Sequence, residues 1–121
     1  MTEIQNKKIY DLEARTQEFA RRCRNLIKQL PKVTTNYEDG SQLTRSSGSV
    51  AANYIEANEA LSKKDFIMRI KISRKESKES RLWLNLIDTQ QIKDLELERQ
   101  ALIKEATELM NIFGSIIRKS E

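Results

Sequence analysis

The chain has 121 residues, which suits one domain better than two, and its three glycines and one proline are too few for the turns of a β-sandwich or β-barrel. A net charge of +4 describes a mildly basic protein, which permits a nucleic-acid partner without requiring one. The chain lacks histidine, the commonest general base and transition-metal ligand, and the lone Cys23 excludes an intramolecular disulfide. We therefore expect neither a cofactor nor a bound metal.

The sequence also bears on the compartment of the protein. No apolar stretch reaches the roughly 20 residues of a membrane-spanning helix, and residues 1–15 lack the apolar core of a secretion signal. We expect a cytoplasmic protein with no membrane partner. Cys23 falls on an apolar helical stripe, which favours a buried core residue over a reactive thiol.

Apolar residues recur at steps of three and four along four segments, a period typical of helices that bury one face. The first predicted helix spans residues 11–30. The second spans residues 36–61, with Asn36 as its N-cap. Its middle, residues 46–54 (SSGSVAANY), is rich in small residues but keeps the helical period. We predict one continuous helix whose small face lets a neighbouring helix approach closely.

The third predicted helix spans residues 62–89, and the fourth spans residues 94–119. The third begins with SKKD, which resembles a capping box with Asp in place of Glu. Its middle is also small and polar, so the middles of the second and third helices would lie opposite each other in an antiparallel hairpin. Together the four segments predict an all-α, antiparallel, up-down-up-down four-helix bundle that forms a single domain over residues 1–121.

Two segments carry more apolar surface than one small bundle can bury. Residues 81–87 (RLWLNLI) and residues 109–117 (LMNIFGSII) are apolar around most of the predicted helix. Surplus apolar surface of this kind is typical of self-association. A homo-oligomer is therefore the first partner that we expect.

The stretch from residue 43 to residue 67 (LTRSSGSVAANYIEANEALSKKDFI) resembles a family of bacterial four-helix bundle proteins encoded in intervening sequences of 23S rRNA genes. The resemblance extends over roughly residues 9 to 119. The residues that carry it are Arg45-Ser46, Ser49-Val50, Ala52-Asn53-Tyr54, Glu56-Ala57, Lys64-Asp65-Phe66, Lys75-Glu76, Glu79 and Trp83-Leu84.

This resemblance implies an antiparallel four-helix bundle that assembles as a ring-like homopentamer, without established catalytic residues. A related branch of the family supplies accessory subunits to the reverse transcriptases of diversity-generating retroelements, and it binds nucleic acid through basic surfaces. The resemblance therefore favours a non-enzymatic scaffold or RNA-associated factor. The alternative function is that of a retroelement accessory subunit, whose partner protein the sequence does not identify.

Two stripes of positive charge are candidate contacts for RNA or DNA phosphates. Their residues recur at three- and four-residue steps, so each stripe lies on one side of its helix. With only 6% aromatic residues, binding would be led by phosphates rather than by base stacking. The alternative is two solvated surfaces without a ligand. The stripes comprise Lys71, Arg74, Lys75 and Lys78 on the third helix, and Arg21, Arg24 and Lys28 on the first.

A second candidate site is a polar seam that borders the apolar stripes of the second and third helices. We interpret it as a device that fixes the register of the helices or a contact between subunits. Its residues are Arg45, Asn53, Glu56, Glu76 and Trp83.

Two Glu-x-x-Glu pairs, Glu56/Glu59 and Glu76/Glu79, permit a third function. Four carboxylates on neighbouring helices could hold Mg²⁺, as in a metal-dependent nucleotide hydrolase. The alternative is that they pair with nearby arginines. Residues 62–88 hold eight Lys/Arg against four Asp/Glu, so counter-charge is sufficient and ion pairing is the favoured interpretation.

Overall fold

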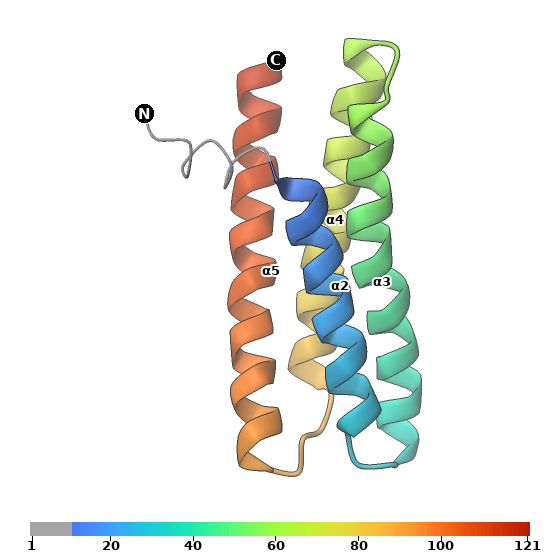
Figure 1. Ribbon diagram of the computed structural model, residues 1–121, viewed down its shortest axis with the longest axis vertical. Helices are drawn as coiled ribbons and strands as arrows, with labels where there is room; N and C mark the ends of the chain where they lie inside the picture. Colours follow the sequence, from blue (N-terminus) through green and yellow to red (C-terminus); the bar gives the residue numbers. More distant parts are fainter. Residues whose placement is uncertain (1–10) are drawn as a thin grey trace.

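The computed structural model describes residues 11–121, which fold into an antiparallel bundle of helices (Figure 1). The chain descends along α2, rises along α3, descends along α4 and rises along α5, which confirms the predicted all-α bundle. No helix in this part of the chain is long and apolar enough to cross a membrane. The helices are α2 (Leu12–Gln29), α3 (Thr34–Asn58), α4 (Lys63–Leu86) and α5 (Lys93–Ser120).

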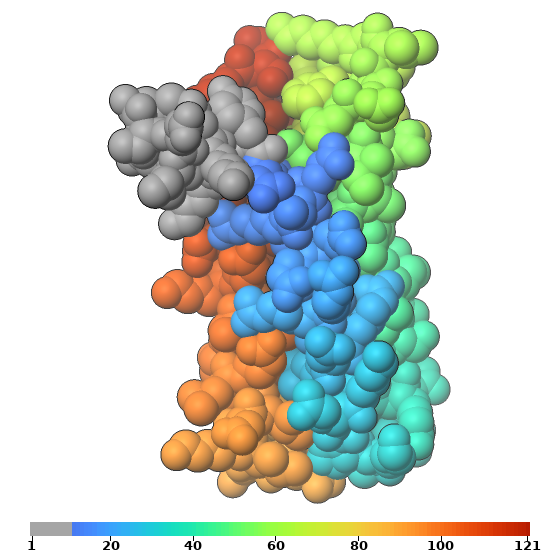
Figure 2. Space-filling model, in the orientation of Figure 1, coloured from blue at the N-terminus to red at the C-terminus, as the bar shows by residue number. Residues whose placement is uncertain are grey.

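Each helix packs against the helices before and after it, and α2 closes the bundle against α5. Figure 2 shows the face on which α2 lies, where its side chains fill the space between α5 and α3. The core is apolar, and the Tyr54 ring lies over Phe113 with centroids 6.0 Å apart. Cys23 is fully buried, and its burial raises the pKa of the thiol to about 12. The thiol is therefore a core group, as predicted.

Asn36 has a different role from the one that its position suggested. α3 begins at Thr34, so Asn36 lies inside the first turn and is not the N-cap. Its amide nitrogen donates to the carbonyl oxygens of Pro31 and Asp88, at 3.0 and 2.9 Å, and its Oδ1 accepts from the Asp88 backbone N–H at 2.8 Å. The buried side chain thus joins the α2–α3 and α4–α5 connections, which meet at one end of the bundle.

The other helix ends differ from the predicted ones by one to three residues at most. α4 begins as its sequence predicted, because Ser62 Oγ accepts from the Asp65 N–H at 3.1 Å. α4 ends at Leu86, before residue 89, and the connection then turns through left-handed conformations at Gln90 (φ 51°) and Gln91 (φ 60°). Asp88 Oδ1 accepts a hydrogen bond from the Gln90 N–H, and Thr89 Oγ1 accepts one from the Gln91 N–H. These two bonds stabilise the turn.

Glu96 joins this connection to the start of α5. Thr89 Oγ1 donates to Glu96 Oε1 at 2.9 Å, and Arg99 Nε donates to the same oxygen at 2.9 Å. Arg99 also donates from Nη1 to the Leu84 carbonyl at 3.2 Å, which satisfies the end of α4. The hydrogen bonds from Arg99, followed by those from Gln100 and Thr89, lower the pKa of Glu96 from 4.5 to about 2.

This shift predicts how acid acts on the bundle. Because the folded-state pKa is depressed, the stabilisation by Glu96 is present above pH 4.5 and is lost as the pH falls towards 2. We expect Glu96→Gln to be less stable than the wild type at neutral pH and to lose less stability across this window. Urea unfolding followed by circular dichroism at a series of pH values measures both effects.

The matched control is Glu59→Gln, which removes an exposed carboxylate that has no hydrogen bond or ion pair within residues 11–121. It should keep the acid sensitivity of the wild type. The role assigned to Glu96 is wrong if Glu96→Gln and the wild type lose stability in parallel over the same pH range.

Candidate nucleic-acid interface and polar seam

The predicted basic stripe of the third helix is a free cationic surface on α4. Lys71, Arg74, Lys75 and Lys78 are all exposed, and none of them forms an ion pair or a side-chain hydrogen bond within residues 11–121. Core positions such as Ser77 alternate with them and face the bundle, which turns the four cations outward. The four side chains line a hollow of about 430 Å³ whose floor includes Met110 and Ile117 of α5.

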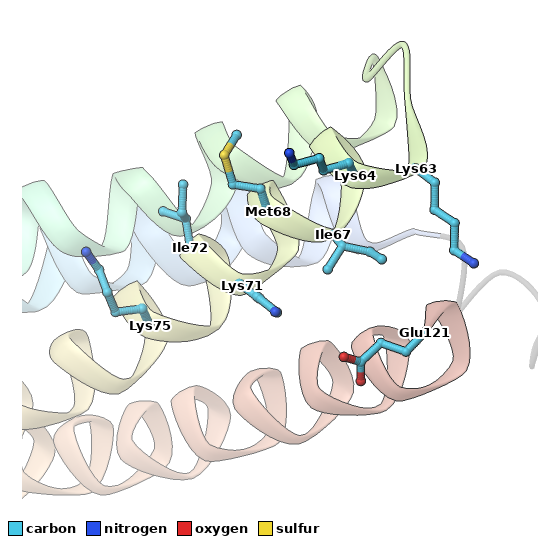
Figure 3. Close-up of a pocket in the computed structure, with 8 residues that line it drawn as sticks. All are labelled: Lys63, Lys64, Ile67, Met68, Lys71, Ile72, Lys75 and Glu121. Carbon is cyan, nitrogen blue, oxygen red and sulfur yellow. The ribbon is translucent and has the colours of Figure 1, made fainter.

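The positive surface extends further along α4 than the sequence suggested. A shallow groove of about 720 Å³ lies at the N-terminal half of the helix (Figure 3). Lys63 and Lys64 border this groove, although they were not among the cations predicted from the sequence. The spacing could have indicated Lys64, because it precedes Lys71 by two helical turns and therefore shares its side of the helix. Its other lining residues are Ile67, Met68, Lys71, Ile72, Lys75 and Glu121.

The three predicted cations of the first helix do not form a comparable surface. Arg21 pairs with Glu18 at 2.6 Å on α2. Arg24 donates to the Ala20 and Thr44 carbonyl oxygens at 3.2 Å, so it is a packing group between α2 and α3. Only Lys28 is exposed and has no side-chain partner within the described residues.

Arg24 also explains a glycine in the middle of α3. A Cβ at Gly48 would lie 3.1 Å from Arg24 Nη2, a tight contact that the guanidinium would have to relieve by moving. The absent side chain leaves room for the Arg24 guanidinium to reach the α3 backbone. Gly48 therefore lies on the α2 side of α3, whereas Ser46 lies on the α4 side.

The predicted polar seam joins α3 to α4 within one chain. Arg45 lies across the helix boundary from two carboxylates, 3.4 Å from Glu76 and 3.0 Å from Glu79. Further towards the C-terminus of α3, Asn53 Oδ1 accepts a hydrogen bond from Arg69 of α4 at 3.1 Å. The seam therefore supplies polar contacts that fix how α3 and α4 align.

Two members of the predicted seam lie elsewhere. Glu56 is exposed near the end of α3 and takes no part in the contacts of the seam. Trp83 packs against the apolar core, and its Nε1 is buried without a hydrogen-bond partner among residues 11–121. Within the same residues, no three carboxylate or thiol side chains gather to hold a metal ion, so the two Glu-x-x-Glu pairs do not form one site.

Buried serines let α3 and α4 come together. Ser46 and Ser80 are fully buried, and their hydroxyl oxygens lie 2.8 Å apart across the helix boundary. Ser73 Oγ donates to the Val50 carbonyl at 3.0 Å, which adds a second hydroxyl contact between the helices. The small residues of 46–54 thus belong to a continuous helix that packs tightly on α4, as predicted.

Comparison with known proteins identifies the family of this bundle. The profile of the 23S rRNA-intervening sequence proteins matches residues 9–115. This range covers most of the chain and includes the whole of α3 and α4. The chain belongs to this family.

A solved structure with a similar sequence has the same fold. It is the crystal structure of a protein with unknown function from the S23 ribosomal protein family of Bacteroides thetaiotaomicron. The sequences are 31% identical, the TM-score is 0.74, and the match covers 87% of this chain and 96% of that chain. No curated protein matches the chain significantly.

The Ser46–Ser80 contact gives a prediction for this member of the family. Ser46→Ala should destabilise the bundle by about 1–3 kcal/mol, because it leaves the buried Ser80 hydroxyl without a partner. The double change Ser46→Ala with Ser80→Ala should cost less than Ser46→Ala alone, since both polar groups are gone. Denaturant unfolding of the single and double variants measures the coupling.

Ser41→Ala, at an exposed position of α3, is the control and should stay within about 0.5 kcal/mol of the wild type. Strictly additive effects of the Ser46 and Ser80 changes would show that the two hydroxyls are not coupled.

Proposed function

We propose that this protein is a non-enzymatic, homo-oligomeric helical bundle that binds RNA or DNA through phosphate contacts along α4. One observation carries the proposal: the cations of α4 stand together on the surface, and no acidic side chain of residues 11–121, Glu121 at the edge of the groove included, forms an ion pair with them. In the same helix, Glu76 and Glu79 are held by Arg45. Both carboxylates of this helix segment therefore contribute to the contact between α3 and α4.

The geometry of the stripe suits a sugar-phosphate backbone. From Lys64 to Lys78 the helix rises about 21 Å, the length of roughly six base-pair steps. The lining of the groove holds aliphatic side chains and methionine but no aromatic ring. Without a stacking platform, binding depends on phosphate charge and tolerates many sequences.

Self-association supports the same function. Apolar side chains remain exposed at several places, among them Tyr37, Ile55 and Leu97, which expose 63%, 45% and 61% of their surface. Covering such residues favours an oligomer. We propose the homopentamer that the family resemblance implies. Five copies of the α4 stripe would bind one nucleic acid more tightly than a single copy.

Salt dependence tests the nucleic-acid contact. Each neutralised phosphate contributes about −0.9 to the slope of log K against log[salt] on duplex DNA and about −0.7 on single strands. We expect the triple change Lys71→Gln, Arg74→Gln and Lys78→Gln to reduce the slope by about two to three such units per bound subunit. Fluorescence anisotropy with labelled single-stranded RNA and duplex DNA, over a salt series, gives the slope.

The charge-matched control changes Lys32, Lys93 and Lys104 to Gln. All three lysines are exposed and lie outside α4. It should leave the slope nearly unchanged. Circular dichroism should show equal helicity for both triple variants. Absence of binding at low salt, or equal slopes for the two triple variants, would remove the nucleic-acid function.

Mass measurement tests the oligomer. Multi-angle light scattering at micromolar concentration should give about five times the 14.1 kDa of one chain. A mass of 14.1 kDa across the concentration series would contradict self-association altogether. A multiple other than five, or than ten for two paired rings, would keep the oligomer and exclude the pentamer.

A further inference from the structure

The outward face of α4 carries a second apolar stripe that α2, α3 and α5 leave uncovered. Met68, Leu82 and Leu86 expose 46%, 48% and 52% of their surface, and Ile72 is half-buried. Together with Lys75 and Glu79, they recur at alternating steps of four and three residues. This is the spacing of a coiled-coil seam, which packs against another helix along its length. We call these six residues the outer seam: Met68, Ile72, Lys75, Glu79, Leu82 and Leu86.

The outer seam and the bundle core use different faces of α4. Ile70, Ser73 and Ser77 are fully buried against the other helices. In Figure 3, Met68 and Ile72 project to one side of α4, away from α5. The outer seam therefore remains available after the bundle has formed.

The outer seam has the same pattern when it is read from either end. Met68 and Leu86 lie nine residues before and after Ser77, Ile72 and Leu82 lie five, and Lys75 and Glu79 lie two. When a second copy of α4 is placed antiparallel at the level of Ser77, each apolar residue meets an apolar residue. At the centre, Lys75 of each copy meets Glu79 of the other. A surface that complements itself in this way suits a two-fold contact, in which both copies use one patch.

The two central charges are free to meet a second copy. Lys75 forms no ion pair within residues 11–121, not even with Glu79 one turn later on its own helix. Glu79 accepts from Arg45 through Oε1 at 3.0 Å, and its Oε2 has no partner in the described part of the chain. An intermolecular Lys75–Glu79 pair would therefore form without breaking an existing contact.

We propose that α4 docks antiparallel against α4 of a second copy through the outer seam, with two Lys75–Glu79 ion pairs at the centre of a two-fold contact. The seam from Met68 to Leu86 is about 27 Å long at 1.5 Å per residue. This contact joins one chain to a second, and it pairs two rings of five into ten when its two-fold axis meets the five-fold axis at a right angle. It requires neither the five-fold ring nor the nucleic acid proposed above.

The two-fold contact also brings two basic stripes together. Lys71 and Lys78 lie along the α5 side of the outer seam, and the two-fold axis places this edge of both copies on the same side. Their like charges weaken the contact at low ionic strength, because unscreened lysines repel one another. If the proposed nucleic-acid binding holds, a bound polyanion neutralises this edge and strengthens the pairing of the two copies.

Charge reversal at the centre of the outer seam tests the contact. Lys75→Glu places carboxylates opposite each other, and Glu79→Lys places ammonium groups opposite each other, so each single variant should self-associate about tenfold more weakly. An equimolar mixture of the two variants should restore association, because each new charge then meets an opposite charge. The double variant Lys75→Glu with Glu79→Lys should restore it as well. Sedimentation velocity over a concentration series measures the doubling step.

Lys104→Glu, an exposed position of α5, is the control for the change in net charge and should associate as the wild type does. Circular dichroism establishes that all variants keep their helices. Single reversals that leave the doubling step unchanged, or a mixture that stays as weak as its components, would overturn the two-fold contact. In particular, a site for an acidic helix from another protein predicts no doubling step in the purified wild type, which would also overturn the two-fold contact. Either result leaves the salt-slope test of nucleic-acid binding and the mass of the ring unaffected.

Discussion

The close contact between α3 and α4 is the constraint on which the rest of the structure depends. Hydroxyl oxygens of Ser46 and Ser80 lie 2.8 Å apart in a place where most bundles hold aliphatic side chains. Small side chains allow the helices to approach closely, and their hydroxyl groups are satisfied across the boundary or by backbone carbonyls. Polar groups buried in this way specify one register, because a shifted register would leave them without partners.

The close contact also affects which side chains α4 exposes to solvent. Serines occupy the central inward positions of α4, while Met68, Leu82 and Leu86 lie on its exposed face. Met68 and Leu82 are nearly half exposed, and the exposed Lys71 and Lys78 lie on the same helix. α4 is therefore the helix of the bundle that combines apolar and positively charged groups on its outward face.

The same serine-rich boundary leaves the acidic groups of α4 in structural roles. Glu76 is almost completely buried next to Arg45, and Glu79 shares the same guanidinium. The positive charges of α4 have no such partners within residues 11–121. Glu76 and Glu79 thus lie beside Arg45 of α3, whereas Lys71, Arg74 and Lys78 line the side of α4 towards solvent and α5. This arrangement is the basis of the phosphate contact that we propose along α4.

The sequence by itself determined the helices, their antiparallel order and their family, because a helix that buries one face repeats its apolar residues every three or four positions. It also predicted the α4 cations and the tight fit of residues 46–54. It was wrong about Asn36, since a favoured cap residue can serve better as a clamp between two connections that meet only after folding. It could not foresee that Arg24 packs beneath Gly48 while Lys28 stays free, because spacing along one helix does not show which helix lies beside it. Tertiary structure alone decided these assignments, as it decided that Arg45 holds Glu76 and Glu79 while Glu56 remains in solvent. A helical period places a residue on a face, but only the packed neighbours determine whether that face meets a charge, a backbone carbonyl or water.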